Sequence, residues 1–288
     1  MIQQGTSVGR LELGPVGIAL DVLPGDEHLA QAAELEHLGY RAIWLPGGQI
    51  DDLSQISKII YATTTVQVGA AILSVDRYRP ETVAAFYGEM QGAAPDRLVV
   101  GLGGPQQPKP LQVMAEYLTS LDTSDPPVPA ARRMLAALGP RKLGLARDRC
   151  AGAIPLLVTP EYTASARQIL GWEGDLVIDQ MVVLDTTASR ARETARGPLR
   201  FLSTVSGYPA NFARMGLSAD DISGLSDRLV DALIAWGDMG SIVDRITSHL
   251  QAGADQVVVT VLSQDRQPRI MDVARGLAAH LPWWSSSS

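Results

Sequence analysis

Short apolar segments alternate along the chain with segments in which apolar residues recur at helical spacing. The strand-length apolar segments are residues 16–20, 42–45, 66–72, 97–102, 134–138, 153–158, 176–184 and 256–262. The last of them, QVVVTVL, is apolar without alternation, which is typical of a parallel strand buried on both faces. Between the first two segments, Leu and Ala recur at helical spacing over residues 29–38, and Gly39 is suited to end that helix.

Eight apolar segments joined by helical segments predict a parallel sheet. In 288 residues, eight such units most simply close into one (β/α)8 TIM barrel, an α/β fold. A doubly wound open sheet is the alternative, but no GxGxxG motif opens a helix after the first strand. We therefore predict a single barrel domain over residues 1–288, with a disordered tail at residues 285–288.

Residues 186–236, after the seventh predicted strand, are more than one crossover helix requires. They contain several short helix-like pieces separated by glycine and proline. Insertions that follow barrel strands commonly lie over the active-site mouth, so a substrate-facing cap is expected. A peripheral or dimer-forming insertion is the alternative.

The composition is that of a globular protein, with 46% hydrophobic and 19% charged residues. A net charge of -7 argues against nucleic acid as a partner, because phosphate backbones require a basic face. The single Cys150 excludes a disulfide framework and fits a reducing cytoplasm. No apolar run has the length of a membrane span, and the first residues lack a signal-peptide pattern. We expect a cytoplasmic protein that acts on a small molecule.

The segment LAALGPRKLGLARDRCAG, residues 135–152, predicts an anion site. An apolar strand leads into Gly139-Pro140, and a helix begins at once with Arg141-Lys142. The first N–H groups of a helix have no partner within it, and the dipole disfavours cations there. Two adjacent cations at this position indicate a bound anion, of which phosphate is the usual example. An ordinary strand–turn–helix with solvated basic residues remains the alternative.

Side chains suited to catalysis are scarce at the predicted strand ends. A histidine metal site is disfavoured because all four histidines fall in predicted helices, namely His28, His37, His249 and His280. A Schiff-base lysine is disfavoured because none of the three lysines lies in an apolar strand, namely Lys58, Lys109 and Lys142. There is no GxSxG elbow and no Cys/His pair. This inventory favours a barrel whose bound, phosphate-bearing cofactor supplies the reactivity.

Seven segments occur in the order found in one known family. They are AAELEHLGYRAIWLP (32–46), DRLVVGLG (96–103), KPLQVMAEYLTSLD (109–122), AALGPRKLGLARDR (136–149), VTPEYTASAR (158–167), SDRLVDALIAWGD (226–238) and HLQAGADQVVV (249–259). On these segments the chain resembles the bacterial luciferase-like superfamily, and within it the actinobacterial branch that uses the deazaflavin coenzyme F420. The resemblance extends from about residue 16 to residue 262, and the chain is a divergent member.

The resemblance implies a (β/α)8 barrel with insertions, commonly dimeric. It also implies that the loop after the fifth strand holds the cofactor phosphate, here with Leu138, Gly139, Pro140 and Arg141, and with Lys142 adding charge. In the family, a bulge with a non-proline cis peptide supports the cofactor ring after the third strand. The corresponding residues here are Ala71 and Ile72, followed by Leu73.

Other residues are expected near the cofactor at the remaining strand ends. The resemblance places Thr159, Pro160 and Glu161 beside it after the sixth strand. The glycines of the fourth strand end would let the ring approach the backbone, namely Gly101, Gly103 and Gly104. Trp44 would wall the pocket, or would instead be an ordinary buried barrel residue.

The chain departs from the family in polar residues near the ring. Gly47 stands where an acidic residue commonly follows Leu-Pro, and Gln106 lies where a small-Ser-His sequence is common. No catalytic residue is therefore assigned, and the candidates by position are Asp21, Arg77 and Glu161.

The favoured function is an F420-dependent oxidoreductase that transfers a hydride between the deazaflavin and a small organic substrate. One alternative is an FMN-dependent luciferase-like monooxygenase. The other is a non-catalytic ligand-binding protein with the same fold. The expected partners are a small-molecule substrate and a second copy in a homodimer, without nucleic acid or membrane.

Overall fold

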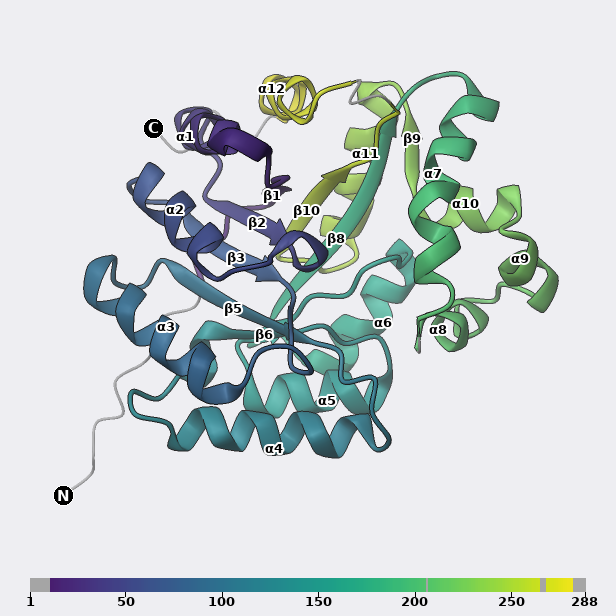
Figure 1. The fold of residues 1–288 in the computed structure, drawn as a ribbon. Coiled ribbons are helices and arrows are strands. Elements are labelled where there is room, and N and C mark those ends of the chain that lie inside the picture. Colours follow the sequence, from purple (N-terminus) through teal and green to yellow (C-terminus); the bar gives the residue numbers. More distant parts are fainter. Residues whose placement is uncertain (1–10, 206, 265–267, 282–288) are drawn as a thin grey trace.

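A closed barrel of parallel strands forms the centre of the computed structural model, which describes residues 11–205, 207–264 and 268–281 (Figure 1). Its eight strands are β1 (Val16–Ala19), β2 (Ala42–Pro46), β3 (Gln67–Ala71), β5 (Leu98–Gly103), β6 (Arg133–Leu135), β7 (Gly152–Ala153), β8 (Asp175–Leu184) and β10 (Gln256–Val261). Every strand pairing is parallel, and β10 pairs with both β1 and β8, which closes the sheet. The predicted (β/α)8 barrel is confirmed. The tail at residues 285–288 lies outside the described residues.

In the described part of the chain, eight helices surround this barrel. They are α1 (Glu27–His37), α2 (Ser54–Ala62), α3 (Pro80–Ala93), α4 (Pro110–Thr123), α5 (Pro140–Arg149), α6 (Pro160–Leu170), α11 (Met239–Gln251) and α12 (Ile270–His280). Proline occupies the first turn of α3, α4, α5 and α6, where its fixed φ suits the helix and its missing N–H costs nothing. A two-residue strand, β4 (Leu73–Ser74), extends the sheet beside β5.

Apolar side chains fill both the barrel interior and the layer between barrel and helices. The interior cluster contains residues from most strands and two residues that precede β1. Its members are Leu11, Leu13, Ala19, Ala42, Trp44, Val99, Met134, Ile154, Val177 and Val258. The larger cluster joins the outer faces of the strands to the helices. Because the interior is packed rather than open, a ligand site is expected at one end of the barrel.

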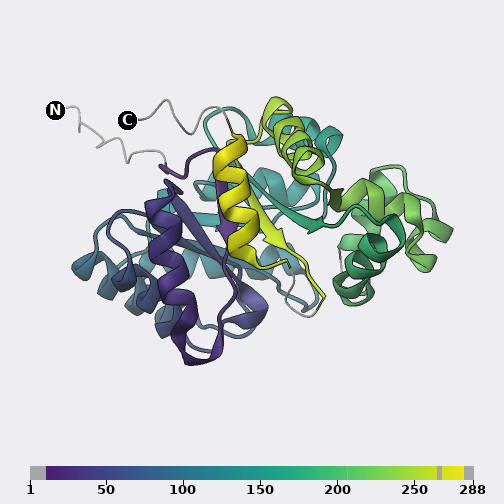
Figure 2. The ribbon, with the colours of Figure 1, turned by 90° about the horizontal axis from the view of Figure 1, so that it is seen from above.

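The insertion after β8 forms a separate small layer of helices. It consists of α7 (Ala188–Leu202), α8 (Tyr208–Arg214), α9 (Ala219–Gly224) and α10 (Asp227–Leu233), followed by β9 (Ala235–Gly237). β9 pairs with the carboxyl end of β8, beyond the part of β8 that pairs with β7. The helices share their own apolar cluster, which reaches Met181 and Val183 of β8. Figure 2 shows these helices gathered at one side of the barrel.

Two strands are shorter than their apolar segments predicted. β6 ends at Leu135 rather than at residue 138, and β7 ends at Ala153 rather than at residue 158. Pro155 lacks the N–H that a ladder needs, and Leu157 has φ 57, so the chain leaves the strand conformation there. Ile154 and Val158 are nevertheless buried, which explains the apolar pattern without a longer strand.

Candidate functional site

The predicted anion site lies at the amino end of α5, which follows the carboxyl end of β6. Gly139 is the N-cap residue, with φ -93 and ψ 156, and no side chain caps the helix. The backbone carbonyl of Gly139 accepts hydrogen bonds from the N–H groups of Lys142 and Leu143, both at 3.0 Å. The first turn contains no acidic residue. This helix end therefore keeps the positive potential that favours an anion.

The insertion brings a further cation to this helix end. A guanidinium nitrogen of Arg214, on α8, lies 3.7 Å from the position that a Cβ on Gly139 would occupy. Arg214 donates to Oδ1 of the buried Asn211 at 2.9 Å, which orients its side chain. The sequence did not predict this residue, because its approach to Gly139 depends on how the insertion packs.

Arg141 and Lys142 differ in their surroundings. Arg141 is exposed, whereas Lys142 is half-buried. Burial lowers the pKa of Lys142 to about 8, and its ammonium group forms no ion pair with another described residue. A bound anion would offset that unfavourable burial of charge.

The loop before α5 is held in place by α6. The Tyr162 hydroxyl donates to the Leu138 carbonyl at 2.8 Å, and the Ala137 carbonyl lies 3.2 Å from the same oxygen. Thr159 is the N-cap of α6, where its side chain accepts from the Tyr162 N–H at 3.3 Å. Thr159 and Pro160 thus form the helix start that positions Tyr162, beside the candidate anion site.

The stretch after β3 has the expected backbone feature. The peptide bond between Ala71 and Ile72 is cis. A Cβ on Gly47 would lie 2.0 Å from the Ile72 carbonyl oxygen. The glycine at position 47, where the resemblance leads one to expect an acidic residue, is therefore required by the close approach of Ile72.

Two of the predicted ring-side glycines have a different role. A Cβ on Gly101 would lie 1.8 Å from the Ala70 carbonyl oxygen, and a Cβ on Gly103 would lie 2.5 Å from Ile72 Cγ1. The space that these glycines provide is thus occupied by Ala70 and Ile72, and their approach to a cofactor ring stays a prediction. Gly104 is more open, since its nearest neighbour would be Ser74 Oγ at 3.4 Å.

Trp44 is a buried barrel residue. Its side chain is 0% exposed, and its Nε1 donates to Gln256 Oε1 at 2.8 Å inside the barrel. The ring lies against Gly69, where a Cβ would come within 2.4 Å of it. These contacts favour the alternative that Trp44 is an ordinary buried barrel residue, and its contact with a cofactor stays a prediction.

The three predicted catalytic candidates lie in different places. Asp21, after β1, accepts from Gln49 Nε2 at 2.7 Å. Arg77, after β4, donates to the Asp51 carbonyl at 2.9 Å. The structure does not bring these two residues into contact with Glu161, which begins α6.

Glu161 belongs to the helical layer. A hydrogen bond from Thr159 lowers the pKa of the exposed Glu161 carboxyl, and the charge of Arg245 on α11 adds to that effect. Its neighbour His249 lies fully buried between Thr163 Oγ1 at 2.8 Å and Gln180 Oε1 at 2.9 Å. This group supports the packing of α6 on α11.

The sequence analysis did not identify Asp179, a buried carboxyl group, because it lies inside an otherwise apolar strand. Asp179, in the VIDQM run of β8, is 9% exposed and accepts from Thr260 Oγ1 at 2.6 Å. Burial raises its pKa to about 6. A charged residue within an otherwise apolar strand was the signal that could have identified it.

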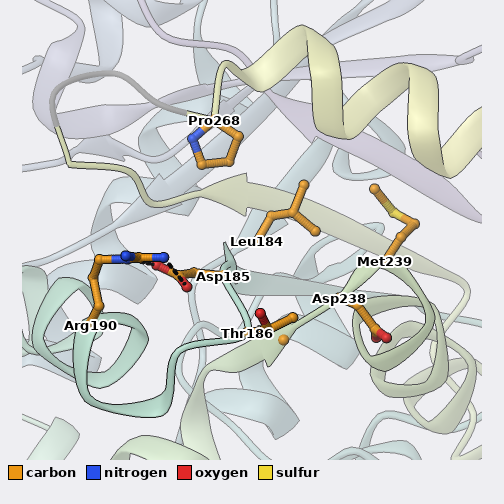
Figure 3. Close-up of a pocket in the computed structure, with 8 residues that line it drawn as sticks. Leu184, Asp185, Thr186, Arg190, Asp238, Met239 and Pro268 are labelled. Atoms are coloured by element: carbon orange, nitrogen blue, oxygen red, sulfur yellow. Dashed lines mark hydrogen bonds and ion pairs between the residues drawn. The ribbon is translucent and has the colours of Figure 1, made fainter.

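A pocket of about 540 Å³ lies at the carboxyl ends of β8 and β9. Its lining comes from these strand ends, from α7, from the start of α11 and from the segment before α12, namely Leu184, Asp185, Thr186, Arg190, Gly237, Asp238, Met239 and Pro268 (Figure 3). Asp185 and Arg190 form an ion pair on its wall (Figure 3). The pocket offers both charged and apolar surface at this end of the barrel.

The described residues give no sign of a metal centre. They contain no cluster of three or more His, Cys, Asp or Glu side chains suited to hold an ion. All four histidines lie in helices, as predicted.

Burial raises the pKa of the Cys150 thiol to about 12, which fits a packed residue and not a nucleophile. Among the residues that the structure describes, no helix is long and apolar enough to cross a membrane.

The first part of the chain matches a known family. Residues 12–114 match the family model described as luciferase-like monooxygenase. The predicted resemblance to the luciferase-like family is confirmed over these residues. A search of curated protein sequences found no match.

Solved structures share the fold over nearly the whole chain. The F420-dependent tetrahydromethanopterin reductase from Methanopyrus kandleri is 16% identical, with a TM-score of 0.68 over 92% of this chain and 97% of its own. An F420-dependent secondary alcohol dehydrogenase, in complex with an F420-acetone adduct, is 14% identical. Its TM-score is 0.72 over 94% of this chain and 99% of its own.

An FMN-containing structure has the same fold. It is the oxygenating constituent of 3,6-diketocamphane monooxygenase from Pseudomonas putida, a type II Baeyer-Villiger monooxygenase in complex with FMN. It is 12% identical, with a TM-score of 0.61 over 91% of this chain and 96% of its own. The structures that share this barrel thus include F420-dependent enzymes and a monooxygenase in complex with FMN.

Proposed function

We propose that this protein is an F420-dependent oxidoreductase whose cofactor phosphate binds at the amino end of α5. The observation that carries the proposal is the uncapped helix start at Gly139 with three cations beside it, namely Arg141, Lys142 and Arg214. The match to the luciferase-like family and the F420-dependent structures of the same fold support the choice of cofactor.

The residues at α5 fit a phosphate in three respects. No side chain caps the helix start, the first turn has no carboxylate, and Lys142 is half-buried without an anionic partner among the described residues. The absence of a Cβ at Gly139 leaves room in front of Arg214. Backbone N–H groups, the helix dipole and the cations would act together on one anion.

When bound, the deazaflavin supplies or accepts a hydride. The residues of this chain would hold its phosphate, and the insertion would cover it by placing Arg214 against Gly139. Under this proposal the insertion at residues 186–236 is a cap over the site. A homodimer and a cytoplasmic location remain predictions.

An FMN-dependent monooxygenase is the second candidate. The FMN complex of a protein with this fold supports it, because the same helix end would accept the phosphate of FMN. A ligand-binding protein without catalytic activity is the third.

The test compares cofactors with their phosphate-free counterparts. F420 and FMN are titrated beside the deazaflavin riboside and riboflavin, which keep the rings but lack the phosphate. We expect micromolar binding of F420, weaker binding of FMN and much weaker binding of both phosphate-free compounds. Equal affinity with and without phosphate would remove the α5 assignment. Preference for FMN would move the proposal to a flavin monooxygenase, and binding without turnover would favour the non-catalytic protein.

A further inference from the structure

A carboxyl group, that of Asp179, lies inside the barrel towards the carboxyl ends of its strands. Val177 of β8 and Val258 of β10 belong to the cluster that fills the barrel interior. Side chains alternate along a strand, so Asp179 and Thr260 point to the same interior face, one layer nearer the carboxyl ends. The hydrogen bond between Thr260 Oγ1 and Asp179 Oδ1 confirms that both side chains share this face.

Among the residues that the structure describes, no cation pairs with Asp179. Its carboxylate accepts a hydrogen bond from the Thr260 hydroxyl. Tyr208, at the start of α8, is the titratable group that interacts with it electrostatically. Leu157 and Met181 form the adjacent end of the apolar cluster beneath the insertion.

This arrangement costs stability and so calls for a functional explanation. A buried carboxylate without a cation is unfavourable, and an apolar residue in β8 would pack at lower cost. Burial raises the pKa of Asp179 to about 6, so the group exchanges its proton near neutral pH. Groups with such values serve as general acids and bases.

We propose that Asp179 is the catalytic residue that exchanges a proton with the substrate, and that the substrate is an uncharged carbonyl compound or the corresponding alcohol. This inference rests on the proposed function. The substrate class follows from the apolar side chains of Leu157 and Met181 and from the lack of a cation paired with Asp179 among the described residues.

The proton and electron balance is complete for this pair of compounds. In reduction, the carbonyl carbon forms a C–H bond with the hydride given up by the reduced cofactor. The π electrons of the C=O bond move to oxygen, which takes the proton from the Asp179 carboxyl. The carbonyl compound is reduced, the cofactor is oxidised, and Asp179 regains a proton from water. Alcohol oxidation reverses each step, with the Asp179 carboxylate as the base.

The test uses three variants of the full chain. Asp179→Asn keeps the size of the side chain and cannot exchange the proton. Thr260→Val removes the hydroxyl hydrogen bond and keeps the shape. Asp148→Asn is the matched control, since it makes the same change on an exposed side chain of α5.

The first measurements are F420 affinity and oxidation of reduced F420 by a panel of aliphatic and aromatic ketones over about pH 5 to 8. We expect Asp179→Asn to keep its F420 affinity within about twofold and to lose about 10²- to 10⁴-fold in rate. The Thr260 hydroxyl lowers the pKa of Asp179, so Thr260→Val should move the pH profile to higher pH. Asp148→Asn should match the wild type.

The second measurement needs no activity. Infrared difference spectra of the cofactor-free protein, wild type minus Asp179→Asn, should show a protonated carboxyl band that is lost as the pH rises through about 6. A carboxyl that is ionised throughout, or turnover unaffected by Asp179→Asn, would overturn the role of Asp179. Wild-type binding of F420 without turnover of any ketone or alcohol would overturn the substrate class. Failure of the wild type to bind F420 would instead refute the proposed function, before any variant is compared.

Discussion

Removal of the Arg214 side chain tests the account of the anion site most sharply, because this residue comes from the insertion and not from the barrel. Its guanidinium lies 3.7 Å from the position of a Cβ on Gly139. A hydrogen bond from a charged group contributes about 1.5–3 kcal/mol. Arg214→Ala should therefore raise the Kd for F420 by roughly 10- to 150-fold, since about 1.4 kcal/mol corresponds to tenfold. An increase in Kd near the lower end of this range is expected, because the Arg214 side chain is exposed and solvent screens its charge.

The assay is a fluorescence titration with F420 at two salt concentrations. The loss should be smaller at high salt, where exposed charges are screened. Arg200→Ala is the matched control, because Arg200 is also an exposed arginine of the insertion but pairs with Glu193 on α7. It changes the net charge equally and should leave the Kd unchanged. Equal Kd values for Arg214→Ala and wild type, at both salt concentrations, would refute the assignment of Arg214 to the phosphate.

Three further predictions concern the barrel and its surroundings. Gly103→Ala should destabilise the fold by about 1–3 kcal/mol in urea denaturation, because the new Cβ would lie 2.5 Å from Ile72 Cγ1; unchanged stability would contradict the packing described. Trp44→Phe should cost about 1–3 kcal/mol by leaving Gln256 Oε1 without its donor, and cofactor affinity should stay the same, whereas a loss of affinity would return Trp44 to the site. His249 stays neutral in the fold because burial lowers its pKa to about 3, while the unfolded chain takes up the proton below about 6.5. The free energy of unfolding should therefore decrease as pH falls from about 6.5 towards 3, and His249→Gln should flatten that dependence; an equally steep profile in the variant would assign the effect to other groups.

The barrel was predictable because its strands carry strong local signals. The run 256–262 has no polar alternation, as required of a strand that is covered on both faces, and it forms β10 at the closure of the barrel. Pro140 after Gly139 marked the start of α5 equally well, since proline suits that position and little else within a helix.

The site was less predictable because it depends on contacts between distant segments. Nothing local to Arg214 indicates that α8 brings it to Gly139. Asp179 was overlooked because its strand is otherwise apolar and its partner Thr260 lies on another strand. Conversely, Gly101 and Gly103 looked like ligand contacts, although their missing side chains make room for Ala70 and Ile72. A glycine in a strand shows that something approaches closely, but not what approaches.

The most direct test of the central claim is an equilibrium titration of the wild-type protein with F420 and, in parallel, with FMN, followed by quenching of tryptophan fluorescence. Circular dichroism of the same sample establishes that it is folded. The account predicts saturable binding of F420 in the micromolar range, tighter than that of FMN and weakened by added salt. Absence of saturable binding of either cofactor to the folded protein would contradict it.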